Sequence, residues 1–309
     1  MSDAPSKLLR NWIARQLPEA ANSWFGDQLK KLESDGSKQA FDIVFGMIPR
    51  KLGKDDLALD AANLADAQAA RAGWRPKRWS VDCAARILLL TDLSRQSNTT
   101  FANRFQDLRR TADLSEILAL YSGLPLYEAP QALVEHAALG LRTNIKAEFE
   151  AIAHDNPFPA EQFGENPWNN MVLKALFIGV LLEPIQGLDR RANPELARIL
   201  RDYAHERWAA GRIVSPELWR CIGPFAEGIF LEDFKRAADQ GGETVRKAVA
   251  LALSTAPESP GKDALHGQLA EFDPAIAGGD LTWAVIADEM FDNSLAITRK
   301  LNTEVEMTR

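Results

Sequence analysis

The stretch that decides the fold class runs from Ser80 to Leu93 and reads SVDCAARILLLTDL. Ser80 is suited to start a helix, because its side-chain oxygen can accept a hydrogen bond from a free backbone N–H of the first turn. Behind it, apolar residues recur at the three- and four-residue spacing of a buried helix face. They are Val81, Ala84, Ala85, Leu88 and Leu89. We therefore expect a helix over residues 80–95.

Similar start signals recur along the chain. A capping side chain stands directly before a proline at Asn166-Pro167, Asn193-Pro194 and Ser215-Pro216, and Asp273-Pro274 is a fourth candidate. Proline suits the first helical position, since its φ is already helical and its missing N–H is not needed there. Alanine and leucine are abundant, whereas alternating β-branched runs are nearly absent from the sequence. The sequence predicts an all-α protein with no significant sheet.

The predicted helices follow one another with short connections. The expected spans are 6–17, 19–33, 38–50, 55–71, 80–95, 98–111, 113–121, 130–140, 142–153, 160–164, 168–179, 194–210, 215–221, 229–239, 242–256, 262–270 and 280–291. Short connections favour layered α-α hairpins, of which HEAT- and armadillo-like proteins are one form. No fixed-period repeat is evident, so the sequence leaves a regular solenoid undecided.

The domain organisation is predicted from composition. Glycine, tryptophan, proline and charge cluster between Gly73 and Lys77, which indicates a boundary. We expect an N-terminal helical segment over residues 1–75, a main helical domain over 76–295, and a polar C-terminal tail over 296–309.

Composition narrows the class of protein. The 309 residues are 46% hydrophobic, enough for a sizeable core, and their net charge of −7 disfavours general nucleic-acid binding. No apolar run approaches the roughly 18 residues of a membrane span, and the N-terminus carries no signal-peptide core. Cys83 and Cys221 are too few for a disulfide framework, and we expect them to be buried. These features predict a cytoplasmic protein, and nothing in the sequence calls for a cofactor.

The region from Glu135 to Ile222 carries the densest set of candidate functional residues. It holds three of the four histidines and three of the eight tryptophans. His154, Asp155 and Asn156 form a loop that Pro157 stiffens, so their side chains are held fairly still over a rigid scaffold. The same four residues also fit a plain helix stop followed by a turn.

Two further helices of this region carry charged candidates. Lys174 stands in an otherwise apolar stretch, where it can hold an anionic ligand or simply pair with an acid. Asp202 lies three residues before His205 and could orient its imidazole for acid–base chemistry, or form an ordinary surface pair. The spacing of His136, His154 and His205 does not support a metal site.

Basic residues cluster beside these helices. They are Arg190, Arg191, Arg198, Arg201, Arg207 and Arg212. Either they form a mixed solvated face with nearby acids, or they join Lys174 in an anion pocket to which Asn144 contributes. Phosphate-binding glycine loops and nucleophile elbows are absent from the sequence.

At these residues the chain resembles the EboA family. The strings that carry the resemblance are RTN at 142–144, EAIAHDNP at 150–157, WNNMVLKALF at 168–177 and YAHERW at 203–208. The match is clearest from Ser80 to Pro224. The resemblance implies an operon-encoded bacterial protein of metabolite traffic. Its operon neighbours include a UbiA-type prenyltransferase, a TatD-like metal hydrolase and sugar-phosphate cyclase- or isomerase-like enzymes, and the system exports secondary-metabolite precursors to the periplasm.

The leading hypothesis is a cytoplasmic accessory protein that binds a small metabolite, prenylated or phosphorylated, or a partner enzyme of the same operon. The groove would lie between the helices of the 135–222 region, with aromatic walls and a few orienting polar groups. Its expected lining is Asn144, His154, Asp155, Asn156, Trp168, Asn169, Lys174 and His205.

Two rival hypotheses stay open. The first is an enzyme acting on a cyclitol or sugar-phosphate intermediate, whose candidate catalytic residues are His154, Asp155, His205 and Lys174. The second is a helical protein–protein scaffold without a ligand pocket, which would display an exposed apolar patch. Trp12, Trp24 and Trp74 are the candidates for that patch.

Overall fold

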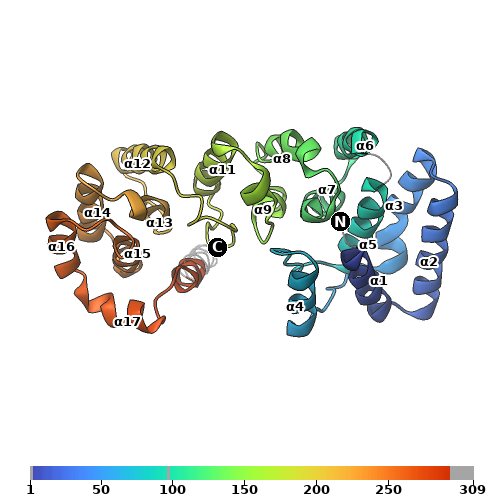
Figure 1. The fold of residues 1–309 in the computed structure, drawn as a ribbon, viewed down its shortest axis with the longest axis horizontal. Coiled ribbons are helices and arrows are strands. Elements are labelled where there is room, and N and C mark those ends of the chain that lie inside the picture. Colours follow the sequence, from blue (N-terminus) through green and yellow to red (C-terminus); the bar gives the residue numbers. More distant parts are fainter. Residues whose placement is uncertain (1–2, 96–97, 293–309) are drawn as a thin grey trace, which may run out of the picture. The chain divides into compact units, whose positions relative to one another are not determined.

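The computed structural model describes residues 3–95 and 98–292, and over these residues it is built from helices (Figure 1). The part of the chain that the structure describes contains no β-strand, and its β-type pairing is limited to isolated bridges such as that between Asp56 and Ser80. The prediction of an all-α fold without a sheet is therefore confirmed, whereas HEAT-like layering stays a prediction. No helix within the described ranges is both long and apolar enough to cross a bilayer.

The chain divides into two compact units, Met1–Trp168 and Asn169–Arg309, and the division falls inside helix α11. The boundary expected near Gly73 to Lys77 lies within the first unit. The predicted polar tail, residues 296–309, lies outside the described residues.

Over its described residues, the first unit consists of ten complete α-helices, two short 3-10 helices and the start of α11. Their bounds are α1 (Ala4–Gln16), α2 (Glu19–Ser34), α3 (Lys38–Leu52), α4 (Ala61–Ala70), α5 (Val81–Ser94), α6 (Asn98–Thr111), α7 (Leu114–Ser122), η1 (Leu124–Leu126), η2 (Pro130–Leu133), α8 (Val134–Gly140), α9 (Lys146–Ala153), α10 (Phe158–Gln162) and α11 (Glu165–Ile178).

Helix α5 is the core helix of the first unit. Its side chains Ile87, Leu88 and Leu90 are fully buried, and it packs against α1, α3 and α7. Ser80 caps it as predicted, accepting a hydrogen bond from the backbone N–H of Cys83 at 3.4 Å. Cys83 itself is half-buried, whereas Cys221 is buried as expected.

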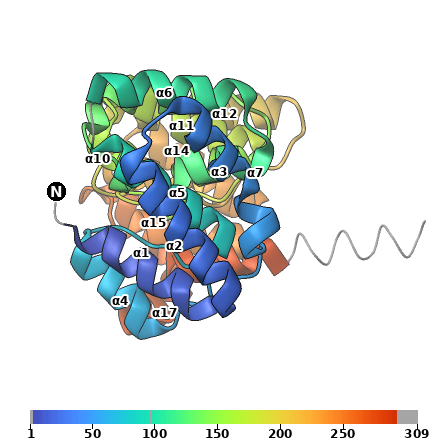
Figure 2. The same cartoon turned by 90° about the vertical axis from the view of Figure 1, so that its right-hand side faces the viewer.

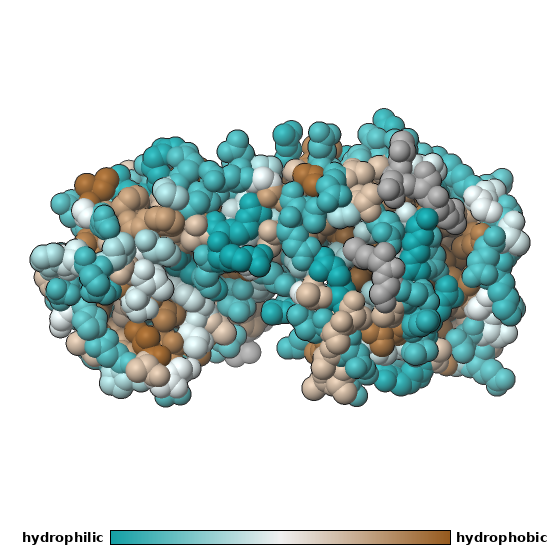
Figure 3. All heavy atoms as spheres, viewed as in Figure 1, coloured by the Kyte–Doolittle hydropathy of each residue, from teal (hydrophilic) through white to brown (hydrophobic). Residues whose placement is uncertain are grey.

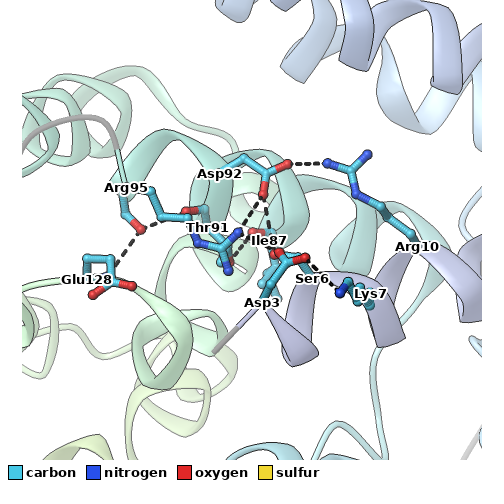
Figure 4. A network of polar contacts seen from close by, with 10 residues as sticks. Asp3, Ser6, Lys7, Arg10, Ile87, Thr91, Asp92, Arg95 and Glu128 are labelled. Carbon is cyan, nitrogen blue, oxygen red and sulfur yellow. Dashed lines mark hydrogen bonds and ion pairs between the residues drawn. The ribbon is translucent and has the colours of Figure 1, made fainter. Parts of the chain in front are cut away.

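A polar network fastens α1 to the end of α5 (Figure 4). Arg10 donates to the Asp92 carboxylate at 2.6 Å, and the Ser6 hydroxyl donates to it at 3.3 Å. Burial raises the pKa of Asp92, and the neighbouring Arg10 and Arg95 act in the opposite direction. In Figure 2, α1 lies beside α4, and both helices contact each other.

The second unit continues from α11 and is centred on a short buried helix, α13. The bounds are α12 (Pro194–Ala209), α13 (Leu218–Ile222), η3 (Gly223–Phe225), α14 (Ile229–Gln240), α15 (Glu243–Leu253), α16 (Pro260–Gly267), η4 (Ala270–Phe272) and α17 (Asp273–Gly278), and residues 283–292 are also helical. Trp219, Cys221 and Ile222 of α13 are buried where this helix packs against α12 and α15.

A long connection between α11 and α12 is fastened to α13 by two side chains. Glu217 is 1% exposed, and its carboxylate accepts the backbone N–H groups of Leu182 at 2.8 Å and Glu183 at 2.6 Å. Arg220 forms a two-pronged ion pair with Asp189 at 2.6 and 2.7 Å. The connection is therefore held by tertiary contacts rather than by helical structure of its own.

The predicted cap-and-proline starts are partly wrong. Asn193 caps α12 as expected, accepting from the N–H of Leu196. In contrast, α11 already begins at Glu165, so Asn166-Pro167 lies inside its first turn. Ser215-Pro216 precedes α13 by a turn, because the Ser215 carbonyl accepts the N–H of Leu218.

Other sequence expectations also need correction. The helix predicted over 55–71 begins only at Ala61, because Asp60 caps it by accepting from the N–H of Asn63. Trp12 and Trp74, named as exposed residues of a scaffold surface, are buried at 3% and 1% exposure. Their rings pack against each other with centroids 5.5 Å apart, so they belong to the core.

Candidate ligand-binding site

The first unit contains a cavity of about 440 Å³ that gathers the His154 loop. We call it the polar cavity. The start of α5, the inner faces of α7 and α9, and the segment before α5 form its walls. Its lining is Lys54, Trp74, Arg75, Arg78, Trp79, Ser80, Asp82, Cys83, Ser115, Leu118, Ser122, Ala147, Glu150, Ala151, His154, Asp155 and Asn156. Cavities of this size commonly hold small molecules.

Asn156 fixes the loop that follows α9. Its side-chain amide donates to the carbonyls of Tyr121 and Ala151, both at 3.1 Å, and its oxygen accepts the N–H of Phe158 at 3.0 Å. Asn156 is 3% exposed. It therefore acts as an anchor of the loop, and its polar groups are already used within the protein.

Replacement of Asn156 by alanine is expected to lower the free energy of unfolding by about 2 kcal/mol, because it leaves buried carbonyl and N–H groups without partners. Asn156→Asp keeps the acceptor for the N–H of Phe158 but presents an oxygen to the carbonyls of Tyr121 and Ala151. It should therefore lower the free energy of unfolding by a similar amount. Thermal unfolding followed by circular dichroism measures both variants. A near-neutral Asn156→Asp would show that the two donated hydrogen bonds contribute little.

Asp155 occupies an unusual position at the cavity wall. Its backbone is left-handed, with φ of 51°. For residues other than glycine, this conformation raises the conformational free energy by about 1 kcal/mol or more. Its carboxylate accepts a hydrogen bond from Arg78 at 3.1 Å and lies 4.0 Å from Arg75. Two guanidinium groups thus converge on one carboxylate at the edge of the cavity.

A buried ion pair lies behind the cavity floor. Asp82 lines the cavity, and its carboxylate accepts from Arg86 at 2.8 Å and from the Ser80 hydroxyl at 2.5 Å. Arg86 is 1% exposed, and its guanidinium also lies 5.3 Å from the centre of the Phe45 ring. The charge of Asp82 is therefore compensated from inside the core.

Tryptophans form one side of the cavity. Trp74 and Trp79 pack with ring centroids 5.9 Å apart, and both belong to the segment between α4 and α5. The Trp74 indole N–H is buried and has no hydrogen-bond partner within the described residues. Buried indole groups usually find an acceptor. This wall therefore lines the cavity with aromatic rings.

The charged residues of the lining balance one another, with Lys54, Arg75 and Arg78 against Asp82, Glu150 and Asp155. Because Asp82 is already paired with the buried Arg86, three cations remain beside the carboxylates of Glu150 and Asp155. These cations can contribute to the binding of an anionic ligand.

The cysteine of the cavity is not activated. Burial, together with the nearby Asp82 carboxylate, raises the pKa of the Cys83 thiol to about 12. Since the thiolate is the nucleophilic form, Cys83 is inert at ordinary pH.

The structure places the predicted site residues in different surroundings. His154, Asp155 and Asn156 line the polar cavity, and His154 is 7% exposed. Asn144 is exposed on the segment before α9, and Trp168 is fully buried.

The other predicted residues belong to the second unit. The side-chain amides of Asn169 and Asn193 exchange two hydrogen bonds, at 3.2 and 2.9 Å, which supports the cap of α12. Lys174 is half-buried, with its ammonium 5.4 Å from the centre of the Phe177 ring. As ligand-binding residues, Asn169, Lys174 and His205 stay predictions.

The ring of His205 is held by a carboxylate far from it in the sequence. His205 Nε2 lies 2.7 Å from Asp233 Oδ1, and Arg201 donates to the same carboxylate at 2.6 Å. Asp202 instead accepts from Arg198 at 2.9 Å. The expected partnership of Asp202 with His205 is therefore wrong.

The cations and tryptophans of the polar cavity are not among the site residues expected from the sequence. They lie in the segment at 73–79, GWRPKRW, whose composition indicates a domain boundary. Its alternation of aromatic and basic residues was the available signal, since such residues are typical of anion-binding surfaces.

Comparison with known protein families identifies the family of this chain. The family model for the metabolite traffic protein EboA matches residues 5–223, more than half of the chain. The chain belongs to the EboA family. No curated protein and no solved structure matches it. The EboA match includes every residue of the polar cavity, whereas Asp233, the partner of His205, lies beyond it.

Proposed function

We propose that this EboA-family protein binds a small metabolite with a phosphate or carboxylate group in the polar cavity. The convergence of Arg75 and Arg78 on the Asp155 carboxylate is the observation that carries the proposal. Metabolite traffic, the description of the family, is consistent with binding rather than with a scaffold alone.

The chemistry of the lining fits such a ligand. Guanidinium groups match the geometry of phosphate and carboxylate and form strong charge-assisted hydrogen bonds with them. Arg75 and Arg78 have 59% and 61% of their side-chain surface exposed, so a ligand can reach them. Lys54 adds a third cation, and the two tryptophans supply the apolar area that fixes a ligand body.

Asp155 acts in this proposal as an internal stand-in for the ligand's anion. Its carboxylate keeps the two arginines in place while the cavity is empty of ligand, and the ligand's anionic group then competes with it. Because the exposed ion pair contributes only about 1 kcal/mol or less, the exchange costs little.

The proposed role is that of an accessory protein in a bacterial pathway, located in the cytoplasm, which presents a secondary-metabolite precursor to a partner protein of the same pathway. The family resemblance supports this wider setting. His154 lines the same cavity and is the residue through which an enzyme would act on the bound metabolite, so the enzyme hypothesis shares this site.

Titration calorimetry with pyrophosphate and with a hexose phosphate tests the proposal. We expect saturable binding to the wild type and about tenfold or greater weakening in Arg78→Gln, since hydrogen bonds to charged groups contribute about 1.5–3 kcal/mol. Arg110→Gln removes the same charge from an exposed position of α6 outside the cavity and should bind like the wild type. Equal weakening in both variants would indicate a general charge effect and contradict the proposal.

A further inference from the structure

A second cavity, of about 390 Å³, lies in the first unit among α2, α3, α5 and α6. We call it the apolar cavity. Its apolar lining comes from three different helices and consists of Leu29, Leu32, Phe41, Leu89 and Leu93. Figure 3 shows hydrophobic residues exposed in the region of α2 and α3, surrounded by hydrophilic ones.

Helix α2 is poorly covered by the rest of the unit. Of its 16 residues only Phe25 is buried, while Leu29 and Leu32 are half-buried and line the cavity. Protein interiors are normally close-packed, and a void deprives the side chains around it of dispersion contacts. A molecule that fills the apolar cavity would restore those contacts to both leucines.

Four of the five charged residues that line this cavity form ion pairs, and Glu33 is the exception among the described residues. Lys38 lies 2.6 Å from Asp107, and Arg104 pairs with Asp42. Asp92 is engaged by Arg10. Glu33 is therefore the one lining charge without an ion-pair partner among the described residues, and its carboxylate disfavours an anionic ligand.

The ion pairs around this cavity favour a small molecule over a peptide. The pair of Lys38 and Asp107 joins α3 to α6 at the cavity, which limits its opening. By comparison, an engineered apolar cavity of about 150 Å³ binds benzene.

We infer that the apolar cavity binds a neutral, apolar small molecule, such as a hydrocarbon chain or a fused aromatic ring. This binding is independent of the anion site, because the two cavities share no lining residue. The ligand class follows from the leucine and phenylalanine lining, from the pairing of every lining charge except Glu33, and from the carboxylate of Glu33, which disfavours an anion.

Titration with phenylnaphthylamine, a neutral apolar probe, tests the inference. We expect saturable one-to-one binding, weakened at least tenfold in Leu29→Trp and in Leu93→Trp, which fill the cavity from opposite walls. Leu114→Trp, at a leucine that is 46% exposed elsewhere on the unit, should bind like the wild type. The charged analogue anilinonaphthalene sulfonate should bind more weakly than the neutral probe.

Two results would overturn the inference. One is the absence of saturable one-to-one binding of phenylnaphthylamine to the wild type. The other is unchanged affinity in both filling variants when circular dichroism shows them to be folded. Leu29 is half-buried, so its replacement leaves the fold in place and keeps the second result decisive. Arg78→Gln, which acts on the polar cavity, should leave the affinity for this probe unchanged.

Discussion

Arg86→Ala is expected to lower the free energy of unfolding by about 3–5 kcal/mol, one of the two largest effects expected for a single substitution in this chain. Arg86 and Asp82 form an ion pair at 2.8 Å in which both side chains are at most 4% exposed. Removing the guanidinium leaves the Asp82 carboxylate desolvated with only the Ser80 hydroxyl as a close donor. An uncompensated buried charge of this kind is far more costly than the pair itself contributes.

Urea unfolding measures the effect, and the double variant Asp82→Ala/Arg86→Ala is its control. Because the double variant removes both charges, it should lose clearly less stability than the sum of the two single variants. Strictly additive losses of stability would show that Asp82 and Arg86 are not energetically coupled. Since Asp82 lines the polar cavity, Arg86→Ala should also weaken ligand binding there.

Glu217→Ala is expected to lower the free energy of unfolding by about 2–4 kcal/mol, because it leaves the N–H groups of Leu182 and Glu183 without their acceptor. Glu217→Gln keeps one acceptor oxygen and should lie between the alanine variant and the wild type. Hydrogen exchange of the two amides measures the loss directly, and both should exchange faster. Glu258→Ala, at a side chain that is 84% exposed, serves as control and should change stability by about 0.5 kcal/mol or less.

The Glu217 site also gives stability a pH dependence. Burial raises the pKa of Glu217 above 4.5, while the two backbone hydrogen bonds oppose this shift. A carboxyl whose pKa is higher in the folded state binds its proton more tightly there. Its contribution to stability is therefore fully present below about pH 4.5 and is lost as the pH rises through the folded-state pKa. Glu217→Gln cannot titrate and should lack this component; an unchanged pH profile would contradict the assignment.

Local features of the fold were predictable from the sequence. Ser80 and Asn193 cap helices as expected, because a cap depends on the few residues that follow it. The helix expected from residue 55 begins later, since the backbone of Asp55 and Leu57 bonds instead to the segment around Trp79 and Val81. Hydrogen bonds between segments this far apart in the sequence cannot be recognised from the residues around either segment.

The candidate site was only partly predictable for the same reason. The loop with His154 and Asp155 stood out through its composition, and it does line a cavity. Its partner Arg78 is 77 residues away in the sequence, so only tertiary packing brings the two together. Likewise, Asp233 is 28 residues from His205 and replaced the nearer Asp202 as its partner.

The measurement that tests the central claim most directly is the affinity for pyrophosphate of Asp155→Asn compared with the wild type. Asparagine tolerates the left-handed backbone of this position, so the loop should be preserved. If Asp155 stands in for the ligand's anion, removing its charge frees Arg75 and Arg78, and pyrophosphate should bind several-fold more tightly. Weaker or unchanged binding by a folded Asp155→Asn would contradict the account of the polar cavity as an anion site.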